Sequence, residues 1–192
     1  MKIRRIILSV ICFTLLAAFT ISKNDVAVAQ TEAKQEKQLI NQESADLMMR
    51  RIRSEELYQS LLSSFGNRES LGVNDYPEYY GGSYTNPDGQ LVVLVVEGHD
   101  GLARQAMSSI GKASSVDYVI EEVKYSYRQL TEAMNTINEV MSADSKPQVF
   151  AQIASIKLLD DRNHIMVELL DDSPEITKRF KDEVLDVPFI TF

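Results

Sequence analysis

The chain has 192 residues, of which 44% are hydrophobic and 25% charged, and its formal net charge is −8 at pH 7. Together with 8 glycines and 5 prolines, this composition excludes a collagen, a long disordered tail and a multi-pass membrane protein. A single cysteine, Cys12, excludes a disulfide scaffold and a thiolate zinc site, and two histidines leave little material for a histidine-rich metal centre.

The first residues have the layout of a secretory signal peptide. Three basic residues, Lys2, Arg4 and Arg5, precede an apolar run over residues 6–21, and Ala27-Val28-Ala29 supplies a cleavage site of small residues. The apolar run is shorter than the ~20 residues that comfortably span a bilayer, so we predict a signal peptide over residues 1–29. An uncleaved membrane anchor is the alternative. Either outcome places the protein outside the cytoplasmic membrane, secreted or in the cell envelope.

Cleavage after Ala29 makes the exported part more acidic. It removes four of the 20 basic residues and one of the 28 acidic ones, which leaves a net charge of −11. Such a charge repels phosphate backbones and anionic lipids, so we expect no nucleic-acid partner, and membrane contact only through an uncleaved N-terminal segment. A solvated acidic surface explains the charge better than a dedicated site for cations or basic proteins.

A helix opens the exported part. Residues 30–44 are polar and predict a loose lead-in, and helical periodicity starts near Ala45 and stops at Gly66-Asn67. The apolar stripe of this helix is too short for three clean heptads, so we predict that it lies on the core of its own domain. Coiled-coil dimerisation is the alternative. Its members are Met48, Ile52, Leu57, Leu61, Leu62 and Phe65.

A hairpin, a helix and a strand follow. Asn86-Pro87-Asp88-Gly89 predicts the hairpin turn, because proline presets one φ angle and glycine accepts the positive φ that closes the bend. The run Leu91–Val96 has six consecutive apolar residues and predicts a central strand covered on both faces. Asp100 is a candidate cap for a helix that ends at Gly111, and residues 116–120 alternate like a third strand.

The same order of elements then recurs. Ser126 and Gln129 form a capping box at the start of a connecting helix. Residues 150–169 read as a second hairpin with its polar turn at residues 160–163, and Asp172-Ser173-Pro174-Glu175 predicts a helix start. The chain ends on an extended segment, residues 187–192.

These patterns predict an α+β protein built from two repeated hairpin-helix-strand units, each a small antiparallel sheet with a packed helix, joined by a helix and preceded by an amphipathic one. The predicted divisions are the signal peptide or anchor (1–29), the polar lead-in and first helix (30–72), the first α+β unit (73–125), the connecting helix (126–146) and the second α+β unit (147–192).

Several segments together resemble a known family. Tyr80-Gly81-Gly82-Ser83-Tyr84, the turn at residues 86–89 and the strand from Leu91 look like the opening of the pro-regions of bacterial chymotrypsin-type serine proteases, the alpha-lytic protease and streptogrisin group. Residues 122–130 and the second hairpin fit the rest of that pattern, so the resemblance covers most of residues 73–192.

The resemblance implies a protein that helps a protease to fold and then inhibits it, with the carboxy-terminal tail in the substrate cleft. The sequence departs from the family because no protease domain follows Phe192 and no Gly-Asp-Ser-Gly motif occurs, so we expect action in trans. The tail residues that would then contact the partner are Pro188, Phe189, Ile190, Thr191 and Phe192. From the residues alone, however, we favour the interpretation that this last strand simply completes a sheet.

A group of tyrosines in the first unit is a second candidate contact surface. Tyr76, Tyr79, Tyr80 and Tyr84 could bind a peptide or glycan, because tyrosine suits half-wet contacts. Packing of one face of the hairpin is the interpretation that we favour for these tyrosines.

Catalytic and metal-binding patterns are weak. Neither His99 nor His164 sits in a recognisable triad motif. The acidic pairs at 121–122, 160–161 and 171–172 suit turn and cap roles better than paired acid and base work. Asn86, Asp88, Asp160 and Asp161 offer too few oxygen ligands for calcium at the required spacing. We therefore expect no enzyme, metal or cofactor, but a protein that binds a secreted serine protease or another extracellular protein. An envelope-associated structural or sensory module is the alternative.

Overall fold

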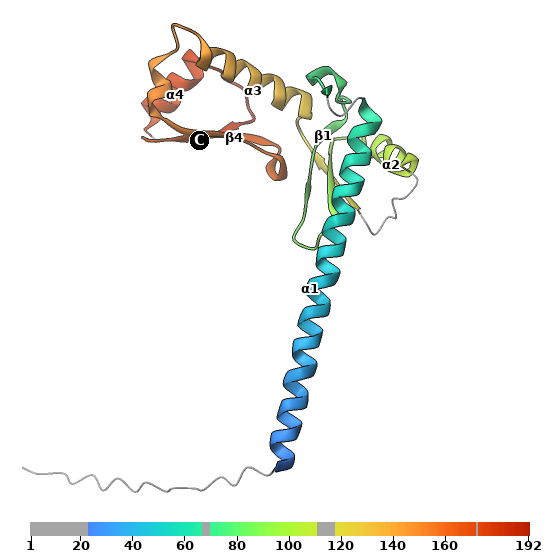
Figure 1. Ribbon diagram of the computed structural model, residues 1–192. Coiled ribbons are helices and arrows are strands. Elements are labelled where there is room, and N and C mark those ends of the chain that lie inside the picture. The colour runs from blue at the N-terminus through green and yellow to red at the C-terminus, as the bar shows by residue number, and fades with distance from the viewer. Residues whose placement is uncertain (1–22, 67–69, 111–117, 172) are drawn as a thin grey trace, which may run out of the picture. The chain divides into compact units, whose positions relative to one another are not determined.

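The computed structural model describes residues 23–66, 70–110, 118–171 and 173–192 (Figure 1). By its internal contacts the chain divides into two parts, Met1–Glu43 and Ser44–Phe192, and the second part contains both sheets. Most of the predicted signal peptide, together with Gly111, Val116 and Asp172 from the predicted elements, lies outside the described residues. The described chain is an α+β protein, as predicted, with four α-helices and two three-stranded sheets.

The first sheet forms around the apolar run that the sequence marks as a central strand. β1 (Tyr80–Thr85) pairs antiparallel with β2 (Leu91–Val96), and β3 (Tyr118–Val123) pairs parallel with the other edge of β2. Five of the six β2 residues are buried, which confirms the predicted two-sided cover. Helix α2 (Asp100–Ser109) connects β2 to β3. Its N-cap is His99, so the prediction of Asp100 as the cap is wrong, and Asp100 is the first helical residue.

The long helix α1 (Lys23–Phe65) covers this sheet with only part of the predicted stripe. Leu57 and Leu61 join the apolar core of the first sheet, which also contains Val93, Val95 and Met107. Met48 and Ile52, by contrast, are exposed. The polar residues 30–44 are helical rather than a loose lead-in. The helix is thus longer than its apolar periodicity.

Helix α3 (Tyr127–Ser142) leads to the second sheet. Its capping box is present as predicted: the Ser126 N–H donates to Gln129 Oε1 (2.9 Å), and the Gln129 N–H donates to Ser126 Oγ (3.3 Å). A short 3-10 helix, η3 (Gln148–Gln152), then precedes β4 (Ile153–Leu159).

The second sheet repeats the order and pairing of the first. β4 pairs antiparallel with β5 (His164–Leu169) through the short 3-10 turn η4 (Asp160–Arg162), and β6 (Ile190–Thr191) pairs parallel with β5. Helix α4 (Pro174–Glu183) connects β5 to β6 and has its predicted proline in the first turn. The repeat is confirmed, but the sheets are mixed rather than antiparallel, because α2 and α4 each return the chain in the direction of the preceding strand.

The second sheet has a core of its own. Leu130 and Ile137 of α3, Ile165 and Val167 of β5 and Phe180 of α4 are all buried in one cluster. Each half of the repeat therefore buries a separate set of large apolar side chains, each contributing ~1.5–3 kcal/mol.

Candidate protein-binding surfaces

The predicted tail contacts divide into buried and exposed residues. Phe189 and Ile190 belong to the core of the second sheet. The backbone holds the segment in place as well, since the Ile165 N–H donates to the Phe189 carbonyl oxygen at 2.8 Å and Ile190 is in register with Ile165. These two side chains therefore anchor the last strand within the sheet, as the favoured interpretation of the tail predicts.

Three other tail residues are exposed. Pro188 and Thr191 are exposed, and Phe192 keeps 43% of its surface accessible. The Phe192 ring lies edge-on to the buried ring of Phe180, with centroids 5.4 Å apart. An aromatic side chain that is held on one side and open on the other is suited to contact with a second molecule.

One face of the β4–β5 pair carries a group of polar side chains. Lys157 Nζ lies 3.0 Å from Glu168 Oε2, and the Ser155 hydroxyl also donates to this carboxylate. These hydrogen bonds, Ser155 first, lower the pKa of Glu168. This face of the β4–β5 pair is therefore charged and solvated.

Two of the four candidate tyrosines pack inside the first unit. Tyr80 and Tyr76 stack with centroids 5.9 Å apart, and both contact the rings of Phe65 and Tyr127. Burial raises the pKa of the Tyr80 hydroxyl, which hydrogen-bonds Ser83 Oγ at 2.8 Å. Tyr80 thus serves the packing of the hairpin rather than a surface contact.

The remaining two tyrosines are half-buried. Burial raises the pKa of Tyr79. The Tyr84 hydroxyl donates to Glu121 Oε2 at 3.4 Å, and burial followed by the charge of Glu121 raises its pKa. Tyr79 and Tyr84 do not join the aromatic cluster of Tyr76 and Tyr80, so the four predicted tyrosines do not form one platform.

Asn163 links the two halves and was predicted only as a turn residue. It has left-handed backbone geometry (φ 53°) and only 3% of its surface is exposed. Its Nδ2 donates to the carbonyl oxygens of Gly81 (2.9 Å) and Tyr125 (2.8 Å), and its Oδ1 accepts from the Tyr125 N–H (3.0 Å). The one sequence signal was its residue type, because asparagine tolerates the left-handed region.

Asp160 lies beside this link. Its Oδ1 is buried and has no hydrogen-bond partner among the described residues. Burial, and then the charge of Asp161, raises the pKa of this carboxyl group. Asp160 in turn contributes to the raised pKa values of Tyr76 and Tyr127, for both of which burial is the larger cause. The Asp160 carboxyl group is therefore part of the packing between the two halves of the repeat. Among the described residues, no group of side chains around it could hold a metal ion.

Arg128 fastens the start of α3 to the segment before β1. Its Nη2 donates to the carbonyl oxygens of Asn74 (3.1 Å) and Tyr76 (2.7 Å), and its Nη1 lies 3.6 Å from Glu78 Oε1. The connecting helix thus has polar contacts to the first unit and an apolar face in the core of the second.

The histidines contact backbone carbonyls. His99 Nδ1 lies 3.1 Å from the Glu97 oxygen, and His164 Nδ1 lies 2.6 Å from the Arg162 oxygen. In the part of the chain that the structure describes, no group of three or more histidine, cysteine and acidic side chains could hold a metal ion. None of the helices within the described ranges is long and apolar enough to cross a membrane.

These features define a class of protein: a two-unit α+β module with a repeated β-β-α-β order, two separate cores and a terminal strand fixed in the second sheet. Comparison with protein families agrees with this organisation. Residues 27–124 match the Pro-like N-terminal domain, and residues 128–192 match the Pro-like C-terminal domain. The chain therefore belongs to the Pro-like domain family, with the N-terminal and C-terminal domains in succession. No curated protein sequence matches the chain closely enough to count as a relative.

Proposed function

We propose that this chain is an exported, non-enzymatic protein that binds a secreted serine protease of the alpha-lytic protease and streptogrisin type. In this role it would assist the folding of the protease, inhibit the folded enzyme, or do both, in trans. The observation that carries the proposal is the succession of a Pro-like N-terminal domain and a Pro-like C-terminal domain in one chain. The resemblance of residues 80–95 and 122–130 to protease pro-regions supports a secreted serine protease as the partner.

The tail supports the proposal through its division into anchored and exposed side chains. Phe189 and Ile190 fix the last strand in the sheet. The neighbouring backbone therefore loses little further conformational entropy when a partner binds. Phe192 presents an accessible aromatic ring directly after that strand. In the proposed complex, Thr191 and Phe192 lie at the substrate cleft and the Phe192 ring fills an apolar specificity pocket.

Inhibition in trans tests the proposal. The mature chain, residues 30–192, is titrated into purified streptogrisin and alpha-lytic protease, and hydrolysis of a chromogenic peptide is followed. In parallel, each denatured protease is diluted into buffer with and without the chain, and recovered activity is measured. We expect inhibition, faster recovery of activity, or both. Phe192→Ala should weaken inhibition about tenfold, because it removes a central aromatic contact.

A matched variant controls for folding. Leu170 is also a large apolar residue with an exposed side chain, but it lies outside the tail, so Leu170→Ala should inhibit like the unchanged chain. If neither protease is inhibited or refolded, the protease-binding function is wrong and an envelope-associated module becomes the better explanation. Turnover of a substrate that His99→Ala or His164→Ala abolishes would instead show an enzyme.

Export is tested separately. Fractionation of producing cells should place the protein in the medium or the envelope, and amino-terminal sequencing of the mature form should begin at Gln30. Recovery of the intact chain from the cytoplasm would contradict this part of the proposal without bearing on protease binding.

A further inference from the structure

A carboxyl group is buried where the two halves of the repeat meet. The turn η4 of the second half contacts β1 of the first half. The Oδ1 atom of Asp160, the first residue of η4, is buried and has no hydrogen-bond partner among the described residues. A Cβ built on Gly82 of β1 would lie 3.8 Å from this oxygen and 3.4 Å from Cδ2 of Tyr127. Asp160 therefore faces the first half across this contact, which we call the η4–β1 joint.

The groups that surround this carboxyl group are neutral or negatively charged. Its charge raises the pKa values of four tyrosines on the elements packed around it, although burial is the largest cause for each. They are Tyr58 of α1, Tyr76, Tyr80 of β1 and Tyr127 of α3. The acidic neighbour Asp161 forms its own ion pair with Arg162 at 3.9 Å. None of the ion pairs within the described residues includes Asp160. An ionised Asp160 is therefore a partly buried charge without a partner, which is unfavourable in a folded protein.

The same turn carries the hydrogen bonds that join the two halves. Asn163 directly follows η4, and its backbone N–H donates to the Asp160 carbonyl oxygen at 3.4 Å. Its side chain is bonded to Gly81 of β1 and to both backbone groups of Tyr125. Because one short turn holds Asp160 and Asn163, a movement of the Asp160 carboxyl group away from β1 also breaks or lengthens these hydrogen bonds.

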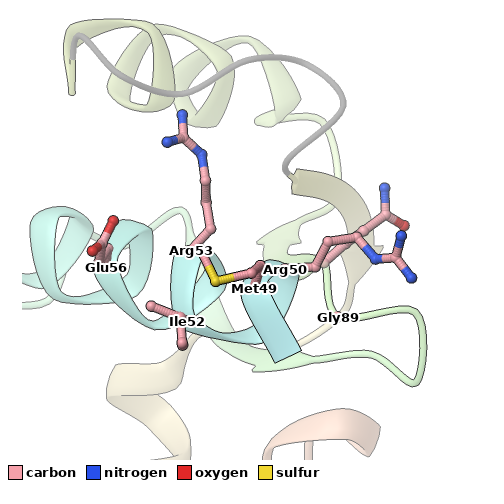
Figure 2. A pocket seen from close by; sticks show the side chains of 7 residues that line it. Met49, Arg50, Ile52, Arg53, Glu56 and Gly89 are labelled. Carbon is pink, nitrogen blue, oxygen red and sulfur yellow. The ribbon is translucent and has the colours of Figure 1, made fainter. Parts of the chain in front are cut away.

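On the other side of the joint, the β1–β2 hairpin is fixed to α1. Figure 2 shows Arg50 of α1 extending toward the turn that holds Gly89, and Arg50 Nε donates to the Asp88 carbonyl oxygen at 2.8 Å. The hydroxyls of Ser54 and Thr85 are 2.7 Å apart. A Cβ built on Gly89 would lie 2.9 Å from the Cβ of Arg50, so the helix and the turn are in close contact. These contacts hold β1 without Asp160, so a movement at the joint falls on η4.

We propose that the η4–β1 joint responds to pH: it is closed while the Asp160 carboxyl group is neutral and opens when this group loses its proton, while both sheets stay folded. The neutral group is tolerated beside the tyrosine rings, whereas the carboxylate regains its hydration when η4 moves away from β1. Burial, and then the charge of Asp161, raises the pKa of Asp160 in the closed joint. The closed joint thus binds the proton more tightly than the open one. It is favoured at low pH and is lost as the pH rises through the raised pKa.

Amide hydrogen exchange tests the joint, because the Tyr125 N–H donates to Asn163 Oδ1 at 3.0 Å and exchanges with water when this bond opens. Exchange in the mature chain, residues 30–192, and in Asp160→Asn is followed by NMR at several pH values from 4 to 8. Comparing the two proteins at one pH removes the intrinsic effect of pH on exchange. At pH 8 the Tyr125 amide should exchange about tenfold faster in the unchanged chain, because an unsatisfied buried group weakens the joint by this order. At pH 4 the two rates should agree.

Low concentrations of urea separate opening of the joint from unfolding. Exchange of Tyr125 should change little with urea, because opening the joint exposes little surface. The buried residues Val93 of β2 and Ile165 of β5 should exchange more slowly than Tyr125, and their exchange should accelerate with urea. Equal rates and equal urea dependence for the three amides would show unfolding and overturn the proposal.

Two further variants complete the test. Asp182→Asn removes an exposed carboxyl group of α4 and should behave like the unchanged chain. Asp161→Asn should move the faster exchange of Tyr125 to lower pH, because the Asp161 charge contributes to the raised pKa of Asp160. The proposal is overturned if Tyr125 exchanges equally fast in the unchanged chain and in Asp160→Asn at pH 8. If Asp160→Asn does not fold, Asp161→Asn decides, and a pH dependence that this variant leaves in place overturns the proposal as well.

Discussion

The side-chain amide of Asn163 donates a hydrogen bond to the carbonyl oxygen of Gly81 across 82 residues of sequence, with an N···O distance of 2.9 Å. The same amide nitrogen also donates to the Tyr125 carbonyl oxygen, while Oδ1 accepts from the Tyr125 N–H. One buried side chain of the second unit thus satisfies backbone groups of the first unit and of the segment that joins them.

Asn163→Ala should lower the free energy of unfolding by about 2–4 kcal/mol. The change leaves the buried carbonyl group of Gly81 and the half-buried backbone groups of Tyr125 without these partners, and it places alanine at a positive φ. Urea unfolding followed by circular dichroism measures the loss. Asn135→Ala, at an exposed position of α3, is the control and should change stability by less than about 0.5 kcal/mol. Equal effects of the two changes would mean that the Asn163 hydrogen bonds contribute nothing.

Gly81→Ala should destabilise the first unit strongly, because the added Cβ would lie 2.4 Å from Val123 Cγ2. Thermal unfolding should show a lower Tm than that of the unchanged chain. Combining the change with Val123→Ala should recover part of the loss by removing the clashing methyl group. Gly101→Ala, where nothing lies within 4 Å of the added Cβ, should not lower the Tm. A Gly81→Ala protein as stable as the unchanged chain would contradict the close packing of β1 and β3.

Because of Asp160, the free energy of unfolding should fall as the pH rises above the ordinary pKa of an aspartate side chain. Burial raises the pKa of this carboxyl group in the folded chain above its unfolded value near 3.8, so the folded state holds the proton more tightly. The stabilisation is complete below the unfolded pKa and is lost as pH rises through the folded one. Urea unfolding between pH 3 and pH 8 measures this dependence.

Asp160→Asn should remove this part of the pH dependence and raise stability at neutral pH, since a neutral amide takes the place of a buried carboxylate. Asp161→Asn should move the loss to lower pH, because the charge of Asp161 contributes to the raised pKa of Asp160. If the difference in stability between the unchanged chain and Asp160→Asn stays constant from pH 3 to pH 8, the carboxyl group does not titrate as described.

Phe189→Ala and Phe192→Ala should separate the structural from the exposed part of the tail. Phe189 is buried in the second core, so its truncation should cost about 3–5 kcal/mol of unfolding free energy. Phe192 is 43% exposed, so its truncation should cost less than about 1 kcal/mol. Urea unfolding of the two variants under one set of conditions checks the contrast. Similar losses would mean that Phe192 is a core residue as well.

The candidate surfaces were only partly predictable. The sequence singled out the tail and the tyrosines by residue type and position, but it could not say that Phe189 turns into the core while Phe192 stays open, since both are phenylalanines of one extended segment. It treated Met48 and Ile52 as core residues because they share a helical period with Leu57 and Leu61. The structure leaves the first pair uncovered, because the five-residue step from Ile52 to Leu57 carries the stripe to the other side of the helix.

Local sequence patterns were sufficient to predict four local elements: the turn at residues 86–89, the central strand from Leu91, the capping box of Ser126 and Gln129, and the proline that starts α4. Each depends on residues a few positions apart, whose backbone preferences act before the chain is packed. The burial of Asn163 against Gly81 could not be predicted in this way, because that contact joins residues from different halves of the repeat. Burial and hydrogen bonding between such distant residues depend on how complete units pack, which local patterns do not encode.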